Sequence, residues 1–220
     1  MSLRLYDYVL SGNCYKVRLL AALLNVEYET VPIDYYPGGE HKQPDFLAIN
    51  PAGTLPAFSD GELVLTETQA ILTYLAAVHD PSRRWLPLDD PLVLANVMQW
   101  LAFSGRLTDT AGRARLHDML NRTLDVEAAR RGAIEVFREL EAHLTERRFH
   151  GGIFLVSDHP TVADIACFPY VALSPDGGID HDDFPAIRSW LYAIKSLDRF
   201  ITMPGIHVLH ERRQIETGAA

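Results

Sequence analysis

The stretch N-P-A-G-T-L-P-A-F-S-D-G-E-L-V-L-T-E-T-Q-A-I-L, residues 50–72, combines three local signals. Pro56 begins a short apolar run, Ser59–Glu62 is a polar turn between two such runs, and Thr66–Thr68 precedes the helical run Ala70–Ala77. A proline at a strand start lacks a ladder donor, and X-Pro bonds adopt the cis form at modest cost. A helix N-terminus has free N–H groups that attract anions. The stretch therefore predicts a site for a small, extended, peptide-like ligand, held by backbone pairing and by a helix terminus.

Composition limits the classes of protein to which the chain can belong. Its 220 residues are 48% hydrophobic and 22% charged, which is typical of one large globular domain or two small ones. The formal net charge of −9 argues against a nucleic-acid surface. Two cysteines, Cys14 and Cys167, exclude a disulfide framework and fit a reducing, cytoplasmic location. We expect no targeting segment and no membrane association, because no apolar stretch has the required length. We also expect no metal site, because the histidines are scattered without metal-ligand spacing; His207 and His210 are the closest pair.

The first part of the chain predicts a compact α/β unit. Alternating apolar residues over Leu3–Tyr8 predict a strand, helical spacing follows over Cys14–Leu24, and Glu27–Ile33 predicts a second strand. A short helical segment over His41–Ile49 precedes the hairpin and helix of the opening stretch. The order is therefore βαβαββα, and we expect the unit to span residues 1–79.

The second part of the chain predicts helices only. Prolines and turn formers mark residues 80–91 as a linker, and residues 92–220 show helical periodicity. Thr161 and Asp164 have the spacing of a capping box, with Asp in place of Glu. The expected helices cover Pro91–Leu107, Asp125–Arg148, a segment that begins at Thr161, and Phe184–Leu197.

Four short motifs, in this order and spacing, resemble the cytosolic glutathione S-transferase superfamily. They are S-G-N-C-Y-K at Ser11–Lys16, N-P-A-G-T-L-P at Asn50–Pro56, the pair Glu67-Thr68, and P-T-V-A-D at Pro160–Asp164. The resemblance covers nearly the whole chain and includes features of bacterial nu-like and of theta- or delta-like members. It implies an α/β plus all-α fold, with an N-terminal thioredoxin-like domain and an all-helical C-terminal domain. It also implies a cytoplasmic homodimer with its interface along the third and fourth helices.

The resemblance implies that glutathione is the co-substrate. Leu55, before a cis-Pro56, would offer its backbone N–H and C=O to the cysteinyl part of glutathione, as a strand would. Glu67 would pair with the γ-glutamyl ammonium, and Thr68 would bind the α-carboxylate at the third helix N-terminus. The implied glutathione-binding residues are His41 and Lys42 for the glycyl carboxylate, and Thr54, Leu55, Pro56, Glu67 and Thr68 for the rest.

Catalysis by such a protein needs the glutathione thiolate. A free thiol has a pKa of about 8.5, so a hydrogen-bond donor to sulfur, with a helix dipole behind it, favours the anion. Ser11 occupies the position of the family's catalytic serine, and Asn13 resembles the nu class, whose members also handle glutathione disulfide. From the residues alone, Ser11 and Asn13 could instead cap the first helix, and Glu67-Thr68 the third.

Cys14 allows two interpretations. It could form mixed disulfides, as in beta-class or omega-class relatives, and so be a third candidate catalytic residue. Its spacing with Val17, Ala21 and Leu24 instead predicts a buried apolar position on the first helix. Since the chain has no Cys-x-x-Cys, dithiol chemistry of the thioredoxin type is excluded.

The electrophile site is expected between the domains, with Leu10 on one wall and Trp100, Phe103 and Arg106 on the other. The predicted function is a glutathione transferase that activates the thiol for attack on a hydrophobic electrophile. Two alternatives stay open. One is a glutathione-dependent disulfide oxidoreductase or peroxidase, and the other is a non-catalytic binding protein with the same fold.

Overall fold

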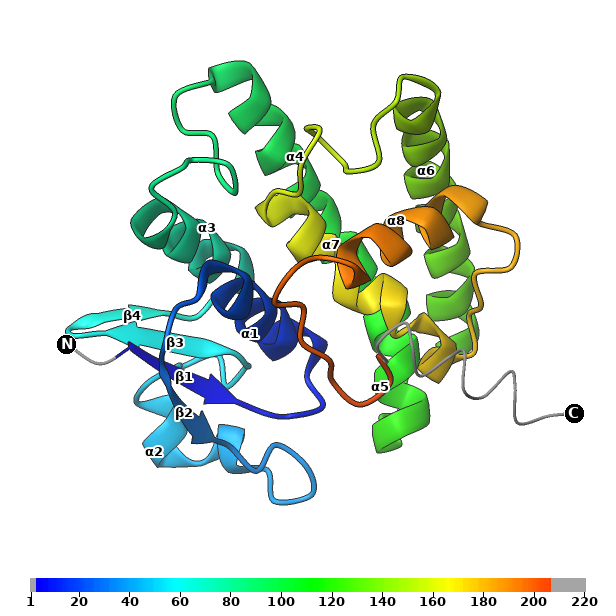
Figure 1. Ribbon diagram of the computed structural model, residues 1–220. Helices are drawn as coiled ribbons and strands as arrows, with labels where there is room; N and C mark the ends of the chain where they lie inside the picture. Colours follow the sequence, from blue (N-terminus) through cyan, green and yellow to red (C-terminus); the bar gives the residue numbers. More distant parts are fainter. Residues whose placement is uncertain (1–2, 207–220) are drawn as a thin grey trace, which may run out of the picture.

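A four-stranded mixed sheet forms the core of the N-terminal part in the computed structural model, which describes residues 3–206 (Figure 1). The strand order is β2-β1-β3-β4. Strand β1 (Leu3–Asp7) pairs parallel with β2 (Glu29–Pro32) and antiparallel with β3 (Ala57–Asp60), which pairs antiparallel with β4 (Leu63–Leu65). The parallel pair requires a crossover, and helix α1 (Gly12–Leu24) supplies it.

Helices cover both faces of this sheet. Helix α1 packs against α3 (Thr68–His79) on one face, whereas the short α2 (Pro44–Leu47) lies on the other (Figure 1). The apolar residues of α1 and α3 at helical spacing are buried against the sheet. This arrangement is the thioredoxin-like domain that the motifs implied.

The rest of the described chain is helical. Helix α7 lies at the centre, where it packs against α1, α3 and α4, and every one of its residues is buried. The helices are α4 (Pro91–Leu107), α5 (Arg113–Leu120), α6 (Val126–Phe149), α7 (Val162–Ala172) and α8 (Pro185–Lys195), with single turns at Thr108–Gly112 and Ser174–Gly177. A further single turn, Glu40–Lys42, precedes α2 in the N-terminal part. The predicted fold class, α/β followed by all-α, is confirmed.

The predicted capping box begins α7. The carboxylate of Asp164, which is 0% exposed, accepts hydrogen bonds from the backbone N–H of Thr161 at 2.9 Å and of Leu155 at 3.0 Å. It also accepts one from the indole N–H of Trp190 at 2.9 Å. Burial raises the pKa of Asp164, and these donors oppose the rise. One carboxylate thus joins the start of α7 to the preceding loop and to α8.

Several expected elements differ in detail from the structure. The segment His41–Ile49 divides into a single turn and α2, because Pro44 at the first helical position has no N–H to continue the turn before it. Helix α5 was not predicted. It continues from α4 through a π-helical turn, Thr108–Gly112, whose threonines and glycine are weak helix formers.

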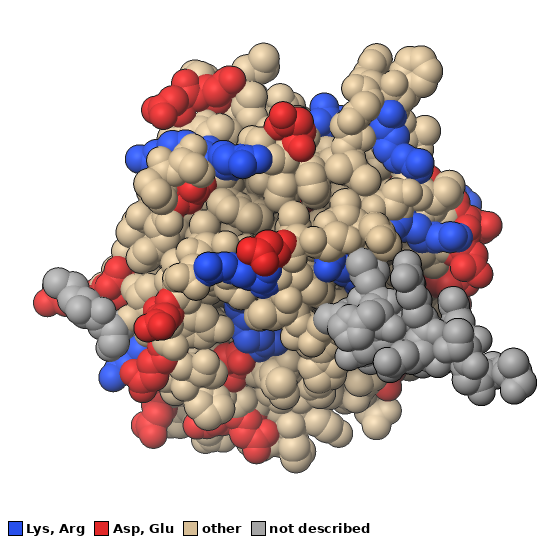
Figure 2. Space-filling model, viewed as in Figure 1, with Lys and Arg blue, Asp and Glu red and all other residues tan. Residues whose placement is uncertain are grey.

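The described surface carries charges of both signs. Figure 2 shows Lys and Arg side chains spread among Asp and Glu side chains on one face, with neither kind covering a continuous area. Within residues 3–206, no helix has the length and apolarity needed to cross a membrane. His207 and His210, the closest histidine pair, lie outside the described residues.

Candidate active site

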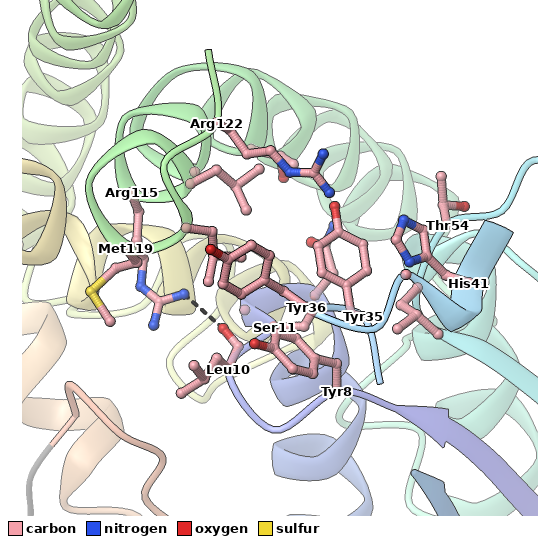
Figure 3. Close-up of a pocket in the computed structure, with 18 of the residues that line it drawn as sticks. Tyr8, Leu10, Ser11, Tyr35, Tyr36, His41, Thr54, Arg115, Met119 and Arg122 are labelled. Carbon is pink, nitrogen blue, oxygen red and sulfur yellow. Dashed lines mark hydrogen bonds between the residues drawn. The ribbon is translucent and has the colours of Figure 1, made fainter. Parts of the chain in front are cut away.

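A cleft of about 770 Å³ opens between the thioredoxin-like domain and α5 (Figure 3). Its volume falls in the range of small-molecule sites. One wall comes from the turn after β1 and from the loops around residues 35–42 and 53–55, and the other from residues 108–122 and α7. The lining residues used below are Tyr8, Leu10, Ser11, Asn13, Tyr35, Tyr36, His41, Lys42, Thr54, Leu55, Leu116, Met119, Arg115 and Arg122.

The side chain of Arg18 stabilises the turn after β1. Its guanidinium pairs with the buried carboxylate of Asp7 and donates to the backbone carbonyls of Tyr8 and Val9. The N–H of Ser11 donates to the Tyr8 carbonyl at 2.9 Å, which closes the turn. The sequence thus places Ser11 in a fixed position at the mouth of the cleft.

Ser11 is the N-cap of α1. Its Oγ accepts the backbone N–H of Cys14 at 3.2 Å, as the capping interpretation predicted. A hydroxyl that accepts one hydrogen bond still has its own proton to donate. Ser11 therefore caps the helix and can also donate to an anion in the cleft, next to the positive end of the α1 dipole. Asn13, two residues further along the chain, lines the same cleft, and its buried Oδ1 has no partner in the described chain.

Cys14 points away from the cleft lining into an apolar cluster. It is 0% exposed and packs with Ile33, Phe46 and Ala57. Burial, followed by the nearby charge of Asp7, raises the pKa of the Cys14 thiol to about 12. The thiol is therefore protonated at pH 7, which supports the buried interpretation over the redox one.

The loop before β3 is shaped by Asn50. Its side chain donates to the Thr54 carbonyl at 2.8 Å and to Thr54 Oγ1 at 3.1 Å, and accepts the N–H of Ala52 at 3.1 Å. This network turns Thr54 and Leu55 toward the cleft, which both of them line. The Leu55–Pro56 peptide bond is cis, as the resemblance implied, while Pro56 itself lies outside the lining.

His41 and Lys42 both line the cleft. His41 is 4% exposed and stacks on Tyr35 at 4.0 Å between ring centroids. Burial, and then the charges of Lys42 and Arg122, lower the pKa of His41, so the ring is neutral at pH 7. Its Nδ1 has no partner within residues 3–206, whereas the Lys42 ammonium donates to the Ala52 carbonyl at 3.1 Å.

Glu67 and Thr68 stand at the N-terminus of α3, outside the lining of the cleft. Glu67 is the exposed N-cap and makes no side-chain capping hydrogen bond, so the cap alternative does not account for its carboxylate. Thr68 begins the helix and is 5% exposed.

Of the four expected electrophile-site residues, Leu10 lines the cleft and the other three do not. The ring of Trp100 packs on Phe103 at 4.7 Å and on His143 of α6 at 4.5 Å, and Arg106 pairs with Glu139 of α6 at the surface. Periodicity identified the helix, but Trp100 packs against α6 and Arg106 forms an ion pair with it, so these side chains are turned to α6. The cleft is lined instead by the continuation of α4, at residues 108–122.

Sequence reasoning placed Tyr8 beside Leu10 on one wall of the cleft, but it missed Tyr35, Tyr36 and the two arginines, Arg115 and Arg122. Arg115 of α5 donates from Nη1 to the Leu10 carbonyl at 2.7 Å and from Nε to Asp176 at 2.9 Å. The Tyr8 and Tyr35 rings lie 5.4 Å apart, and the Arg122 guanidinium lies 5.5 Å from the Tyr35 ring centroid (Figure 3). No local pattern identifies these residues, because Arg115 lies in α5 and Arg122 lies beyond its end at Leu120. In the described chain, no group of three His, Cys, Asp or Glu side chains gathers as a metal site requires.

Known proteins match this chain over nearly its whole length. The family model described as "Glutathione S-transferase, N-terminal domain" matches residues 1–77, and "Glutathione S-transferase, C-terminal domain" matches residues 125–191. A probable glutathione S-transferase, GSTF2, of Oryza sativa subsp. japonica is 30% identical, over 86% of this chain and 89% of its own.

A maleylacetoacetate isomerase of Pseudomonas aeruginosa is 28% identical, over 99% of this chain and 100% of its own. The crystal structure of a possible glutathione S-transferase from Rhodopseudomonas palustris superposes with a TM-score of 0.82 at 31% identity, and covers 92% of this chain and 98% of that one. The motifs, the two-domain fold and these relatives agree, and the chain belongs to the cytosolic glutathione S-transferase superfamily.

Proposed function

We propose that this protein is a glutathione transferase that ionises the thiol of glutathione at Ser11 and directs it at an electrophilic carbon. The observation that carries the proposal is the position of Ser11. Its hydroxyl is fixed by the Cys14 N–H, stands at the positive end of α1 and opens on a cleft between the two domains. The family membership of the chain supports glutathione as the thiol.

The tripeptide would lie along the loop before β3. Leu55 would pair its backbone with the cysteinyl part, and Thr54 lies beside it. The N-terminus of α3, which receives no side-chain cap from Glu67, would take the γ-glutamyl α-carboxylate at Thr68 while Glu67 takes the ammonium. Lys42 and the neutral His41 would donate to the glycyl carboxylate at the other end.

The proposed reaction forms a bond between sulfur and carbon. The thiol proton leaves to solvent when glutathione binds, the thiolate attacks the electrophilic carbon, and the leaving group departs with its electron pair. Lowering the thiol pKa by one unit requires about 1.4 kcal/mol. A hydrogen bond from Ser11 to a charged sulfur, at about 1.5–3 kcal/mol, suffices.

A second candidate function is the reduction of glutathione-containing disulfides. Asn13 favours it, because its buried Oδ1 lacks a partner in the described chain and faces the same cleft, where a second glutathione could donate an N–H. In that reaction the thiolate attacks a disulfide sulfur and releases the other sulfur as a thiol. The buried Cys14, whose pKa is about 12, would take no part.

Steady-state kinetics with 1-chloro-2,4-dinitrobenzene and with 2-hydroxyethyl disulfide separate the two functions. The proposal predicts aryl transfer well above the uncatalysed rate. High disulfide turnover with negligible aryl transfer would instead assign the second function. If immobilised glutathione also failed to retain the protein, the non-catalytic binding protein would become the better description.

We also infer a homodimer that buries the outer faces of α3 and α4. Large apolar side chains are exposed there, with Val78 54%, Leu92 75% and Met98 48% exposed. Such exposure is typical of an interaction surface when the residues are contiguous. Light scattering at micromolar concentration measures the oligomeric state, and a monomeric mass would contradict the inferred homodimer.

A further inference from the structure

We propose that the second substrate of this enzyme carries a carboxylate, and that the guanidinium of Arg115 binds it. The inference rests on the proposed transferase function and names the class of electrophile: a carboxylic acid on an aromatic or unsaturated frame. It replaces the purely hydrophobic electrophile expected from the sequence.

The first observation is an unpaired, buried guanidinium nitrogen. The side chain of Arg115 is 6% exposed, with Nη1 on the Leu10 carbonyl and Nε on Asp176. Its Nη2 is buried and has no partner within residues 3–206. Buried polar groups in native proteins are almost always paired, so an unpaired nitrogen on a residue that lines a cleft points to a ligand.

The second observation is the charge of the cleft. Among its described lining residues stand Lys42, Arg115 and Arg122, and no Asp or Glu, although the chain has a net charge of −9. Asp176 lies behind Arg115 and is not part of the lining. A cleft lined by one sign of charge attracts ligands of the other sign.

The third observation separates Arg115 from the cations that glutathione needs. Lys42 and His41 lie in the wall formed by the thioredoxin-like domain, where the glycyl carboxylate is expected. Arg115 belongs to the opposite wall, on the same side as the apolar Met119 (Figure 3), and Leu116 lines that wall as well. Arg122 instead reaches the Tyr35 ring and lies close enough to His41 to lower its pKa. The wall around Arg115 is therefore left for the second substrate, with the apolar side chains for its frame and the Arg115 guanidinium for its carboxylate.

The reaction that uses this site is the transfer already proposed. With 4-chloro-3-nitrobenzoate, the thiolate attacks the ring carbon that carries chlorine, the C–S bond forms, and chloride leaves with the bonding electrons. The carboxylate stays unchanged on Arg115 and orients the ring toward Ser11, because Arg115 and Ser11 are linked through the Leu10 carbonyl.

The test compares 4-chloro-3-nitrobenzoate with 4-chloro-3-nitrobenzamide, each kcat/KM divided by the uncatalysed rate constant with glutathione. We expect the wild-type protein to favour the acid by at least about tenfold, and Arg115→Gln to lose that preference. Arg113→Gln is the matched control, because Arg113 is exposed on the same helix and lies outside the lining. Arg122→Gln, at the exposed end of the wall, should reduce the preference by a smaller factor that falls with added salt.

A binding measurement tests the carboxylate site at Arg115 separately from the transferase function. Calorimetry with unreactive 4-nitrobenzoate and 4-nitrobenzamide, in the presence of S-methylglutathione, should show tighter binding of the acid in the wild type and in Arg113→Gln only. Equal binding of acid and amide by the wild type would overturn the inference, even if aryl transfer is observed. An equal loss for both electrophiles in Arg115→Gln, with a raised thiol pKa, would overturn it too, since Arg115 would then serve the thiolate. If neither electrophile reacts while the acid still binds through Arg115, the transferase function fails and the anion site stands.

Discussion

The ammonium of Lys16 lies 4.9 Å from the centre of the Tyr170 ring and 3.5 Å from Thr108 Oγ1. Lys16 belongs to α1 and is 0% exposed, whereas Tyr170 belongs to α7, so a buried amine lies between the two domains. No carboxylate pairs with it among the described residues. Burial accordingly lowers the pKa of Lys16 to about 8, and the charge of Cys167 opposes this shift.

The first prediction concerns the pH dependence that Lys16 gives to stability. Its pKa is about 8 in the folded protein and 10.5 for the free side chain, so between these values the unfolded chain binds more protons and the Lys16 contribution to stability rises with pH. The difference corresponds to about 3 kcal/mol over the whole interval.

Urea unfolding of wild type and Lys16→Met at pH 7, 8, 9 and 10 measures this contribution. Buried tyrosine and cysteine residues lower stability over the same range, because their pKa values are raised, and taking the difference between the two proteins cancels their effect. We expect the wild type to gain about 2 kcal/mol relative to the variant between pH 8 and 10. Parallel profiles would show that Lys16 titrates as it does in water.

The second prediction concerns Gly12, the first residue of α1. A Cβ at Gly12 would lie 2.8 Å from the ring of Tyr170, and a Cβ at Gly112 would lie 3.0 Å from the same ring. Gly12→Ala should therefore cost about 1–3 kcal/mol through overpacking. Gly105→Ala is the control, because nothing lies within 4 Å of its Cβ position in α4, and it should stabilise by about 0.5–1 kcal/mol. Differential scanning calorimetry should show melting temperatures that shift in opposite directions.

The third prediction concerns Cys14. With its thiol buried and its pKa raised to about 12, native protein should resist iodoacetamide at pH 7, and Cys14→Ala should keep its transferase rate within about threefold. Mass spectrometry of the alkylated peptide and steady-state kinetics measure both effects. Rapid alkylation, together with loss of turnover in the variant, would return the catalytic role to this cysteine.

The fourth prediction concerns Ser11. Ser11→Ala should lower kcat/KM by about ten- to a thousandfold, the range typical of a lost donor to a developing or stabilised anion. The pKa of the bound thiol, followed by thiolate absorbance in the ultraviolet, should rise toward that of free glutathione. Cys14→Ala is the matched control and should leave that pKa in place. An unchanged pKa and rate in Ser11→Ala would transfer the role to Asn13.

The sequence was sufficient for the parts of the fold that local physics determines. Alternation identified β1, helical spacing identified α1, α4 and α6, and the capping pair Thr161–Asp164 located the start of α7. These signals lie in neighbouring residues, so no knowledge of the tertiary structure was needed.

Much of the cleft could not be predicted because it is formed by packing between the two domains. Trp100 and Phe103 have the apolar pattern of an electrophile site, but only the tertiary structure shows that Trp100 packs on His143 of α6 and that neither residue lines the cleft. From the sequence, Arg115 is an ordinary charged residue of a helix. Only the structure shows that its Nη1 donates to the Leu10 carbonyl. Glu67 is at the expected helix start, yet whether a ligand reaches it is a question of distance that no sequence pattern answers.

The most direct test of the central claim is a crystal structure of the protein with glutathione. We predict that the tripeptide lies along Thr54 and Leu55, with its sulfur within about 3.5 Å of Ser11 Oγ and its γ-glutamyl end at Glu67 and Thr68. A cleft that stays empty at saturating glutathione, or a sulfur atom turned away from Ser11, would contradict it.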